Sequence, residues 1–312
     1  MFFTDGRYEQ QAGLEVQGSK VAVVRKPPLA AAGEWLAANA KKLGMKTLGI
    51  EAEHLTVAEH SRMTKALPSG LRLRAAPPLV EQARMIKDAE EIEQLRAAVL
   101  LGASLFDVIL GAIRPGVKET EVAAELEYAA RRAGADGMSF ETIIASGSRS
   151  ALPHGRASEA AIPASGFVVC DFGVILAGYC SDMTRTVRVG RAGPKMRWIY
   201  EAVREAQRTA LETVRAGVST GEVDRSARKV LHSNGLGRNF THSTGHGVGL
   251  EIHEAPRLAA GQKDVLQPGM VITIEPGAYI PGVGGVRIED MVVVTERGCQ
   301  ILTPTGKELI TI

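Results

Sequence analysis

A segment that recurs about one hundred residues later constrains the fold of this 312-residue chain more than any other feature. RPGVKETEV at 114–122 aligns with RAGVSTGEV at 215–223, and the match continues to Gly134 against Gly235. Each copy follows a long helical pattern, carries a second helix and leads into sequence rich in strand-forming residues. Two copies of helix, helix and antiparallel sheet predict a pseudo-twofold α+β domain, with helices packed on one side of a curved sheet.

The strand-rich sequence after each copy predicts where the sheet turns. After the first copy, GFVVCDFGVILAGYCSDMTRTVRV (166–189) predicts a hairpin that turns near Ala177–Gly178. After the second copy, MVITIEPGAYI (270–280) and GGVRIEDMVVVTERG (284–298) predict two strands joined by a link rich in Gly and Pro.

Five residues with metal-binding side chains lie in apolar or glycine-rich settings of the two halves: Asp171, Asp182, His246, Glu275 and Glu289. The two aspartates lie on opposite arms of the predicted hairpin, where unpaired like charges would repel each other. A carboxylate at the end of an apolar run is costly to bury unless its charge is compensated. Oxygen-rich ligation with one imidazole suits two divalent ions that share bridging carboxylates. The set therefore predicts a metal site between the halves, and hydrolysis by a metal-activated water.

The first part of the chain predicts a separate small α/β domain. Residues 21–26 and 45–51 read as strands, and residues 29–42 read as a helix. Pro77 and Pro78 mark a boundary, so we expect domains at 1–77 and 78–312. A helix is then expected from about Leu79 to Ile113, where Pro115 and Gly116 end it.

Composition narrows the function classes. A hydrophobic content of 45% and a net charge of +2 are ordinary for a globular protein, and they give no reason to expect nucleic acid or a membrane surface as a partner. The three cysteines lack CxxC spacing, which predicts a cytoplasmic protein. We expect no apolar run that approaches the roughly 18 residues of a membrane span, and the N-terminal sequence does not read as a signal peptide.

The segments that carry the metal-binding residues resemble those of a known family. VVCDFG, GYCSDMTRTV, THSTGHGVGLEIHE, TIEPGAYI and GVRIEDM are similar to the signature segments of the pita-bread metallopeptidases. The nearest branch by resemblance holds the Xaa-Pro dipeptidases (prolidases) and the Xaa-Pro aminopeptidases. MIKDAEEIEQLRAAV also resembles the segment that opens the catalytic domain of this family.

The resemblance implies a dinuclear centre, typically of manganese or cobalt, with zinc or iron as alternatives. Carried onto this chain, Asp182 and Glu289 would bridge the two ions. Asp171 would hold one ion, whereas His246 and Glu275 would hold the other. A bridging hydroxide would attack the scissile carbonyl, and Glu275 would carry the proton to the leaving nitrogen.

Four further residues match positions of the family that face the substrate. His154, in ALPHGRAS, would contact the substrate near the scissile bond, and His253, in EIHE, would hydrogen-bond its carbonyl. His242 would line the pocket. Arg287 would clamp a substrate carboxylate or orient the bridging glutamate, although a plain surface arginine is an equally simple interpretation. The implied substrate is a short peptide with proline in the second position.

One departure from the family concerns the N-terminal domain. MFFTDGRYEQQAG resembles a segment partway through that domain, so we expect its first portion to be missing from this chain. In the family this domain borders the active site of a neighbouring subunit. A homodimer is therefore implied, and the shortened domain leaves both the oligomeric state and the selection of substrate length open.

Two alternatives remain beside the Xaa-Pro peptidase. The first is a hydrolase of the same fold with another substrate, similar to methionine aminopeptidase or creatinase. The second is a non-catalytic protein of this fold that binds peptides or partner proteins, although all five metal-binding residues are retained. The sequence lacks a Walker A motif, a GxSxG elbow and HExxH, so other enzyme classes find little support. Dipeptidase and aminopeptidase activity are not distinguished.

Overall fold

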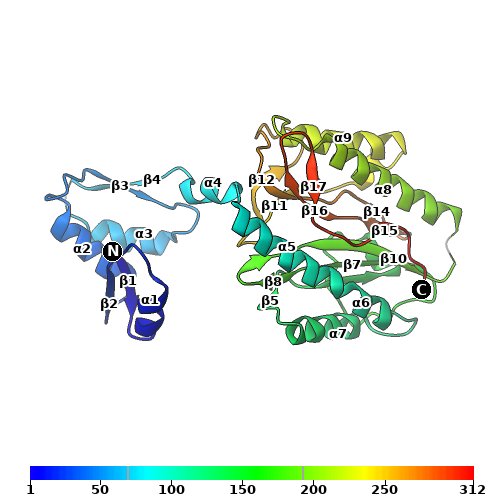
Figure 1. Ribbon diagram of the computed structural model, residues 1–312, viewed down its shortest axis with the longest axis horizontal. Helices are drawn as coiled ribbons and strands as arrows, with labels where there is room; N and C mark the ends of the chain where they lie inside the picture. Colours follow the sequence, from blue (N-terminus) through cyan, green and yellow to red (C-terminus); the bar gives the residue numbers. More distant parts are fainter. Residues whose placement is uncertain (69, 192) are drawn as a thin grey trace. The chain divides into compact units, whose positions relative to one another are not determined.

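The computed structural model describes residues 1–68, 70–191 and 193–312 (Figure 1). The chain divides into two compact units, Met1–Val80 and Glu81–Ile312. The division falls three residues beyond the boundary expected at 77/78, inside a short helix that the two prolines precede.

The first unit contains two pairs of parallel strands, each connected through a helix. Phe2 pairs with Val21 in one pair, and Thr47 pairs with Arg72 in the other. The predicted strands and helix of this unit are present within a few residues of their expected bounds. Its elements are β1 (Phe2–Asp5), α1 (Glu9–Glu15), β2 (Val21–Val24), α2 (Pro28–Asn39), β3 (Thr47–Ile50), α3 (Val57–Ala66) and β4 (Arg72–Ala75).

The expected helix over 79–113 is three helices: α4 (Leu79–Met85), α5 (Ala89–Ser104) and α6 (Phe106–Ala112). The chain leaves the helical path because the Lys87 N–H donates to Gly269 O at 2.9 Å. A capping box then starts α5, since Glu91 N donates to the Asp88 carboxylate and Asp88 N donates to the Glu91 carboxylate, both at 2.9 Å. The D-x-x-E pattern at 88–91 was a start signal for this helix, and the prediction of one continuous helix is wrong there.

The span Ala89–Ala112 is long and apolar enough to cross a membrane by length and composition alone, which corrects the expectation that the chain has no such run. A core helix passes the same test. Leu95 and Val99 are buried in one apolar cluster of the second unit, and Phe106 and Ile109 are buried in another. These side chains therefore already have a role in packing. Length and composition alone are weak evidence for a membrane segment.

The repeat folds into two equivalent helix pairs, which confirms the pseudo-twofold prediction. In the first half Gly116 (φ +88°) precedes α7 (Glu119–Arg132), and its N–H donates to Ile162 O at 2.9 Å. In the second half α8 (Pro194–Thr213) ends before Gly217 (φ +83°), whose N–H donates to Leu266 O at 3.0 Å; α9 (Thr220–Ser233) follows. The two glycines hold left-handed turns that side chains disfavour.

Antiparallel sheets form the other layer of the second unit. The first half has the order β10-β7-β6 and the second has β12-β11-β13-β16-β17. In Figure 1, α6 and α7 lie beside the strands of the first half, and α8 and α9 lie beside those of the second. The strands are β5 (Gly137–Met138), β6 (Ile143–Ser146), β7 (Gly166–Phe172), β8 (Val174–Leu176), β9 (Tyr179–Cys180), β10 (Met183–Val189), β11 (Gly245–Gly247), β12 (Glu254–Leu258), β13 (Val271–Ile274), β14 (Gly277–Ile280), β15 (Gly284–Arg287), β16 (Asp290–Val294) and β17 (Cys299–Ile301).

The predicted hairpin turns where expected. Leu176 pairs with Tyr179, and both intervening residues have positive φ, +50° for Ala177 and +82° for Gly178. Two left-handed residues in a two-residue loop are typical of a type I′ turn, which matches the twist of the flanking strands. Beyond it, β7 and β10 pair in register over seven residues, and Asp171 lies opposite Thr184.

Apolar side chains fill the space between helices and strands in each half. Leu126 of α7 packs with Ile144 and Val168 of the first half, and Leu231 of α9 packs with Ile272 of the second. All five are fully or almost fully buried, and each such side chain contributes about 1.5–3 kcal/mol through removal from water. The two cores fix the strands whose ends carry the predicted site residues.

Substitution of Gly116 by alanine should lower the free energy of unfolding by about 1 kcal/mol, because alanine disfavours a positive φ. Gly111 in α6 is a matched control, since both positions have open space where a Cβ would be added and Gly111 is helical. Gly111→Ala should raise the free energy of unfolding by up to about 1 kcal/mol. Denaturant unfolding measures both, and equal effects would contradict the assignment of the turn.

Candidate metal centre

The nine residues predicted for the site line one cavity of about 650 Å³. The five predicted ligands lie in strands or at strand ends: Asp171 in β7, Asp182 just before β10, His246 in β11, Glu275 just after β13 and Glu289 just before β16. Strand ends bring the carboxylates of both halves to one cavity while their apolar neighbours stay in the core.

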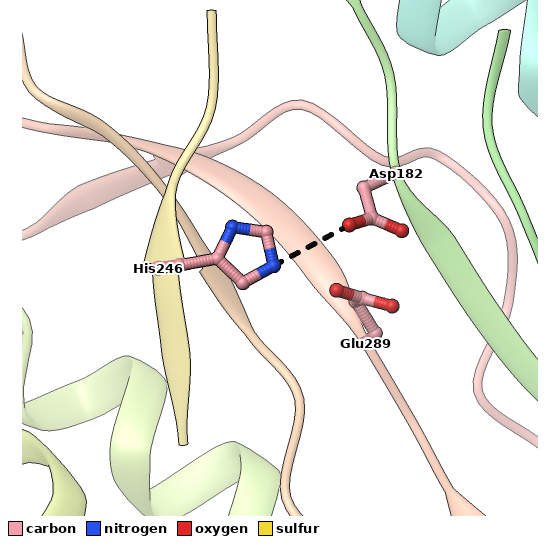
Figure 2. A group of neighbouring side chains, drawn as sticks. All are labelled: Asp182, His246 and Glu289. Carbon is pink, nitrogen blue, oxygen red and sulfur yellow. Dashed lines mark ion pairs between the residues drawn. The ribbon is translucent and has the colours of Figure 1, made fainter. Parts of the chain in front are cut away.

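Asp182, His246 and Glu289 form the tightest group in this cavity (Figure 2). One ligand atom from each lies within 4.8 Å of the others. His246 Nε2 is 3.6 Å from Asp182 Oδ2 and also 3.6 Å from Glu275 Oε1. A donor set of carboxylate oxygens and one imidazole nitrogen within this distance is suited to a divalent cation.

The ring of His246 is oriented as a metal ligand. Its Nδ1 lies 3.0 Å from Gly247 O, and the hydrogen bond leaves the proton on Nδ1, so Nε2 presents its lone pair to the carboxylates. Burial lowers the pKa of His246 to about 4, so the ring is neutral near pH 7. A neutral imidazole with a fixed tautomer is the form that binds a cation.

The glycines beside His246 serve the packing of the backbones around β11. A Cβ added at Gly245 would lie 2.0 Å from Thr273 O, and one added at Gly247 would lie 2.2 Å from Ala255 O. Both glycines therefore let the neighbouring backbones approach β11 closely. Neither has a positive φ, so close packing and not the backbone angle calls for glycine at these two positions.

The carboxylates repel one another and are poorly solvated. Burial first, and then the charge of Glu289, raise the pKa of Asp182 and of Glu275 well above the usual range. Burial, followed by the charge of Asp171, raises the pKa of Glu289 to about 8. Raised values of this kind mark a site whose carboxylate charge is only partly compensated, since Arg287 lowers these pKa values less than burial raises them.

Three buried carboxylate oxygens make no hydrogen bond within the part of the chain that the structure describes: Asp171 Oδ1, Asp182 Oδ1 and Glu289 Oε1. Buried oxygens without partners are costly and uncommon in folded proteins. All three belong to predicted ligands that line the same cavity. These residues therefore fit a divalent metal site, because a bound cation would satisfy the free oxygens and the repulsion together.

Arg287 is buried, with 3% of its surface exposed, so the simple surface interpretation is wrong. Its Nη2 donates to Asp171 Oδ2, its Nε donates to Thr184 Oγ1 at 3.1 Å, and its Nη1 donates to Pro153 O at 3.0 Å and to Tyr279 Oη at 2.6 Å. The protein itself occupies these donors, which leaves little capacity for a substrate carboxylate. Its direct carboxylate contact is with Asp171, and it reaches Glu289 only through Thr184.

Sequence reasoning missed Thr184 and Tyr279. The Thr184 hydroxyl donates to Glu289 Oε2 at 2.6 Å, and Thr184 follows Asp182 by two residues, the spacing that places side chains on one face of a strand. The hydroxyl of Tyr279 lies 2.8 Å from His242 Nε2. Burial raises the pKa of Tyr279 to about 12, so its hydroxyl keeps its proton and donates it to His242.

The three pocket histidines differ in how free their rings are. Both nitrogens of His242 are engaged, with Nδ1 at 2.8 Å from Ser243 O, and burial lowers its pKa to about 3. His154 and His253 lie on exposed loop segments. The ring of His253 contacts that of His246 edge to face, with centroids 4.5 Å apart. His154 and His253 can therefore face a ligand, whereas His242 lines the wall.

The metal-free protein should lose stability as pH rises from about 4.5 to about 8. The pKa of Glu289 is raised to about 8 in the folded chain, so the stability from this bound proton is present below the unfolded value and lost as pH passes the folded one. A bound cation replaces the proton, so manganese-loaded protein should show a smaller decline. Thermal unfolding with manganese or with a chelator measures the difference.

The control for this pH dependence is Glu289→Gln, which removes the titrating group. In this variant the decline of the metal-free protein with pH should become shallower. A gap between loaded and metal-free melting temperatures that stays constant across this range would contradict the interpretation.

Comparison with known proteins agrees with the geometry. The profile of metallopeptidase family M24 matches residues 93–296, and that of the creatinase/prolidase N-terminal domain matches residues 1–86. A Xaa-Pro dipeptidase of Pyrococcus furiosus is 48% identical over 232 residues, which cover 74% of this chain and 67% of that protein.

Solved structures extend the match to almost the whole chain. The Xaa-Pro dipeptidase from Bacillus anthracis superposes with a TM-score of 0.94 at 44% identity, covering 99% of this chain and 86% of that one. The X-Pro aminopeptidase from Thermotoga maritima superposes with a TM-score of 0.89 at 36% identity, covering 99% and 87%. The chain belongs to metallopeptidase family M24, in its Xaa-Pro dipeptidase (prolidase) group, and is a metallo-exopeptidase with the pita-bread fold.

Proposed function

We propose that this peptidase hydrolyses the Xaa-Pro bond at the N-terminus of a dipeptide or short peptide with two divalent metal ions. The carrying observation is the group of three buried carboxylate oxygens that have no hydrogen-bond partner among the described residues, close to Nε2 of His246. Manganese is the first choice among the metals, with cobalt, zinc and iron as alternatives, because carboxylate-rich sites with one imidazole accept all four.

We assign the five ligands according to the family resemblance. On that basis the two ions would be held by Asp171, Asp182, His246, Glu275 and Glu289. Arg287 and Thr184 support this arrangement, since their hydrogen bonds hold Asp171 Oδ2 and Glu289 Oε2 and leave the other oxygen of each carboxylate free for a cation.

When bound, the ions supply an activated water and polarise the scissile carbonyl. Glu275 accepts the proton of that water on its carboxylate and delivers it to the proline nitrogen that leaves. His253 donates a hydrogen bond to the carbonyl oxygen as negative charge develops there, and His154 orients the peptide near the scissile bond. The closed hydrogen bonding of His242 makes it part of the pocket wall in this scheme.

The similar proteins include both dipeptidases and an aminopeptidase. The Bacillus anthracis and Pyrococcus furiosus proteins are Xaa-Pro dipeptidases, and the Thermotoga maritima structure, which covers as much of this chain, is an X-Pro aminopeptidase. A dipeptidase is the primary proposal, because the Bacillus anthracis and Pyrococcus furiosus dipeptidases are 44% and 48% identical to this chain, against 36% for the aminopeptidase. The aminopeptidase is the second candidate.

The partners and the compartment are also proposals. A short peptide is the substrate, and a homodimer is the proposed assembly, because the N-terminal domain in this family borders a neighbouring subunit. A cytoplasmic location is consistent with the cysteines, since Cys170, Cys180 and Cys299 are all free thiols.

Hydrolysis of Ala-Pro and Ala-Pro-Ala by protein stripped of metal and reloaded with manganese tests the proposal. Cleavage of the dipeptide alone, dependent on manganese, is the expected result for a dipeptidase. Cleavage of the tripeptide would establish the second candidate. Absence of cleavage of both peptides by fully loaded protein would contradict both.

Asp182→Asn and Glu289→Gln should each remove both turnover and bound metal, because each takes away a carboxylate that would hold the ions. Metal analysis by mass spectrometry and peptide hydrolysis measure the two effects on the same samples. Glu296→Gln is the control, since Glu296 is an exposed carboxylate outside the cavity. Wild-type activity in either ligand variant would exclude the dinuclear assignment.

His253→Ala should lower kcat by about a hundredfold, as expected for the loss of one donor to a developing oxyanion. Its metal content should equal that of the wild type, because His253 is assigned to the substrate. His60→Ala, at an exposed histidine of the first unit, provides the control. Metal loss in His253→Ala would show that the residue supports the metal site instead.

A further inference from the structure

Glu119 is a fully buried carboxylate that the catalytic scheme does not use. It is the first residue of α7 and is 0% exposed, and it does not belong to the lining of the cavity that the described residues form. A buried carboxylate and its cationic partner together contribute little net stability compared with apolar residues of the same volume. The carboxylate therefore calls for an explanation beyond packing.

The partners of Glu119 lie at both ends of the loop that carries His154. On one side its Oε1 accepts hydrogen bonds from Ser146 N at 2.7 Å and from Ser146 Oγ at 2.8 Å. On the other side its Oε2 accepts from Ser158 N at 3.2 Å and from Ser158 Oγ at 2.7 Å. One rigid carboxylate thus ties together two positions twelve residues apart and closes the loop between them.

A fifth contact extends this tie toward the histidine itself. Arg149 donates from Nε to Glu119 Oε2 at 3.0 Å and from Nη2 to Arg156 O at 2.8 Å. Arg156 lies two residues after His154, and Arg156 N donates to His154 O at 3.0 Å. On the side of the cavity, Arg287 Nη1 holds Pro153 O, one residue before His154. The backbone around His154 is therefore fixed from both sides.

The second half of the repeat holds another pocket histidine in the same way. The buried Asp224 of α9 pairs with Arg228 and accepts from Thr244 Oγ1 at 2.8 Å. Arg228 in turn donates to the carbonyl of His242. A buried helix carboxylate paired with an arginine thus fixes a histidine segment in both halves, which favours positioning over incidental packing.

We propose that Glu119 is a positioning residue for catalysis, acting through the loop 146–158 on the placement of His154 in the substrate pocket. The inference rests on the proposed function, because it requires that His154 contacts the substrate. Misplacement of a substrate-contacting group by about 1 Å is enough to reduce catalysis strongly.

Glu119→Gln is the first test, in the manganese-loaded full chain with Ala-Pro as substrate, or with Ala-Pro-Ala if that is the peptide cleaved. The amide has one acceptor oxygen, and its nitrogen would oppose donors at Ser158 or Ser146. We expect kcat/KM to fall by about tenfold or more with metal content unchanged. Glu125→Gln, at an exposed glutamate of the same helix, is the matched control and should keep wild-type activity.

A double-mutant cycle with His154→Ala separates positioning from general damage to the fold. If Glu119 acts through His154, Glu119→Gln should change kcat/KM by less than about twofold in the His154→Ala background. The same loss in both backgrounds would overturn the inference. If His154→Ala lowers kcat/KM and Glu119→Gln leaves it unchanged, the inference is overturned too, and the proposed function stays intact.

Two further outcomes are distinguishable. If His154→Ala leaves kcat/KM at the wild-type value, the role of His154 in the proposed function is refuted, and the inference falls with it. If Glu119→Gln does not fold, Ser158→Ala takes its place in the cycle, because it removes only the 2.7 Å hydrogen bond to Glu119 and the acceptor for Ala160 N. A smaller loss that likewise disappears in the His154→Ala background supports the proposal, and a loss that persists there contradicts it.

Discussion

Repulsion among carboxylates that the fold forces together is the constraint on which the catalytic cavity depends. Asp171, Asp182, Glu275 and Glu289 lie at one cavity because strands of two separate cores end there. The fold can sustain this arrangement because apolar packing of each half holds the strands, while Arg287 and Thr184 each bind one oxygen of Asp171 and of Glu289. A bound cation would compensate the remaining charge, so metal binding and the sheet geometry would be parts of one energetic arrangement.

The sequence predicted the features that depend on local pattern. The repeat, the turn at Ala177–Gly178 and the five ligand positions followed from periodicity, turn chemistry and charged residues beside apolar runs. The break near Lys87 was not foreseen, because it depends on a hydrogen bond to Gly269, far away in sequence. Tyr279 was missed for a similar reason, since its role comes from contacts to His242 and Arg287 that no local pattern encodes.

The three pocket histidines share one structural solution to the problem of placing a side chain on a loop. The backbone segments that carry His154 and His242 are each held by a helix carboxylate paired with an arginine. His253 lies beside a third ionic pair. There, Glu254 accepts from Lys87 Nζ at 3.0 Å and from Arg84, and its carboxylate also accepts from Glu251 N at 3.1 Å. Loops are otherwise the most mobile parts of a protein, and ionic ties at their ends supply the rigidity that a catalytic group needs.

The pseudo-twofold repeat divides the ligand set unequally between its halves. The first half supplies only Asp171 and Asp182, and the second supplies His246, Glu275 and Glu289. Neither half alone presents the complete set of predicted donors, so a cation held by all five would need both cores to be folded. Metal binding at this site would therefore be linked to the cooperativity of folding, and a chain with one half unfolded would lose the site together with its packing.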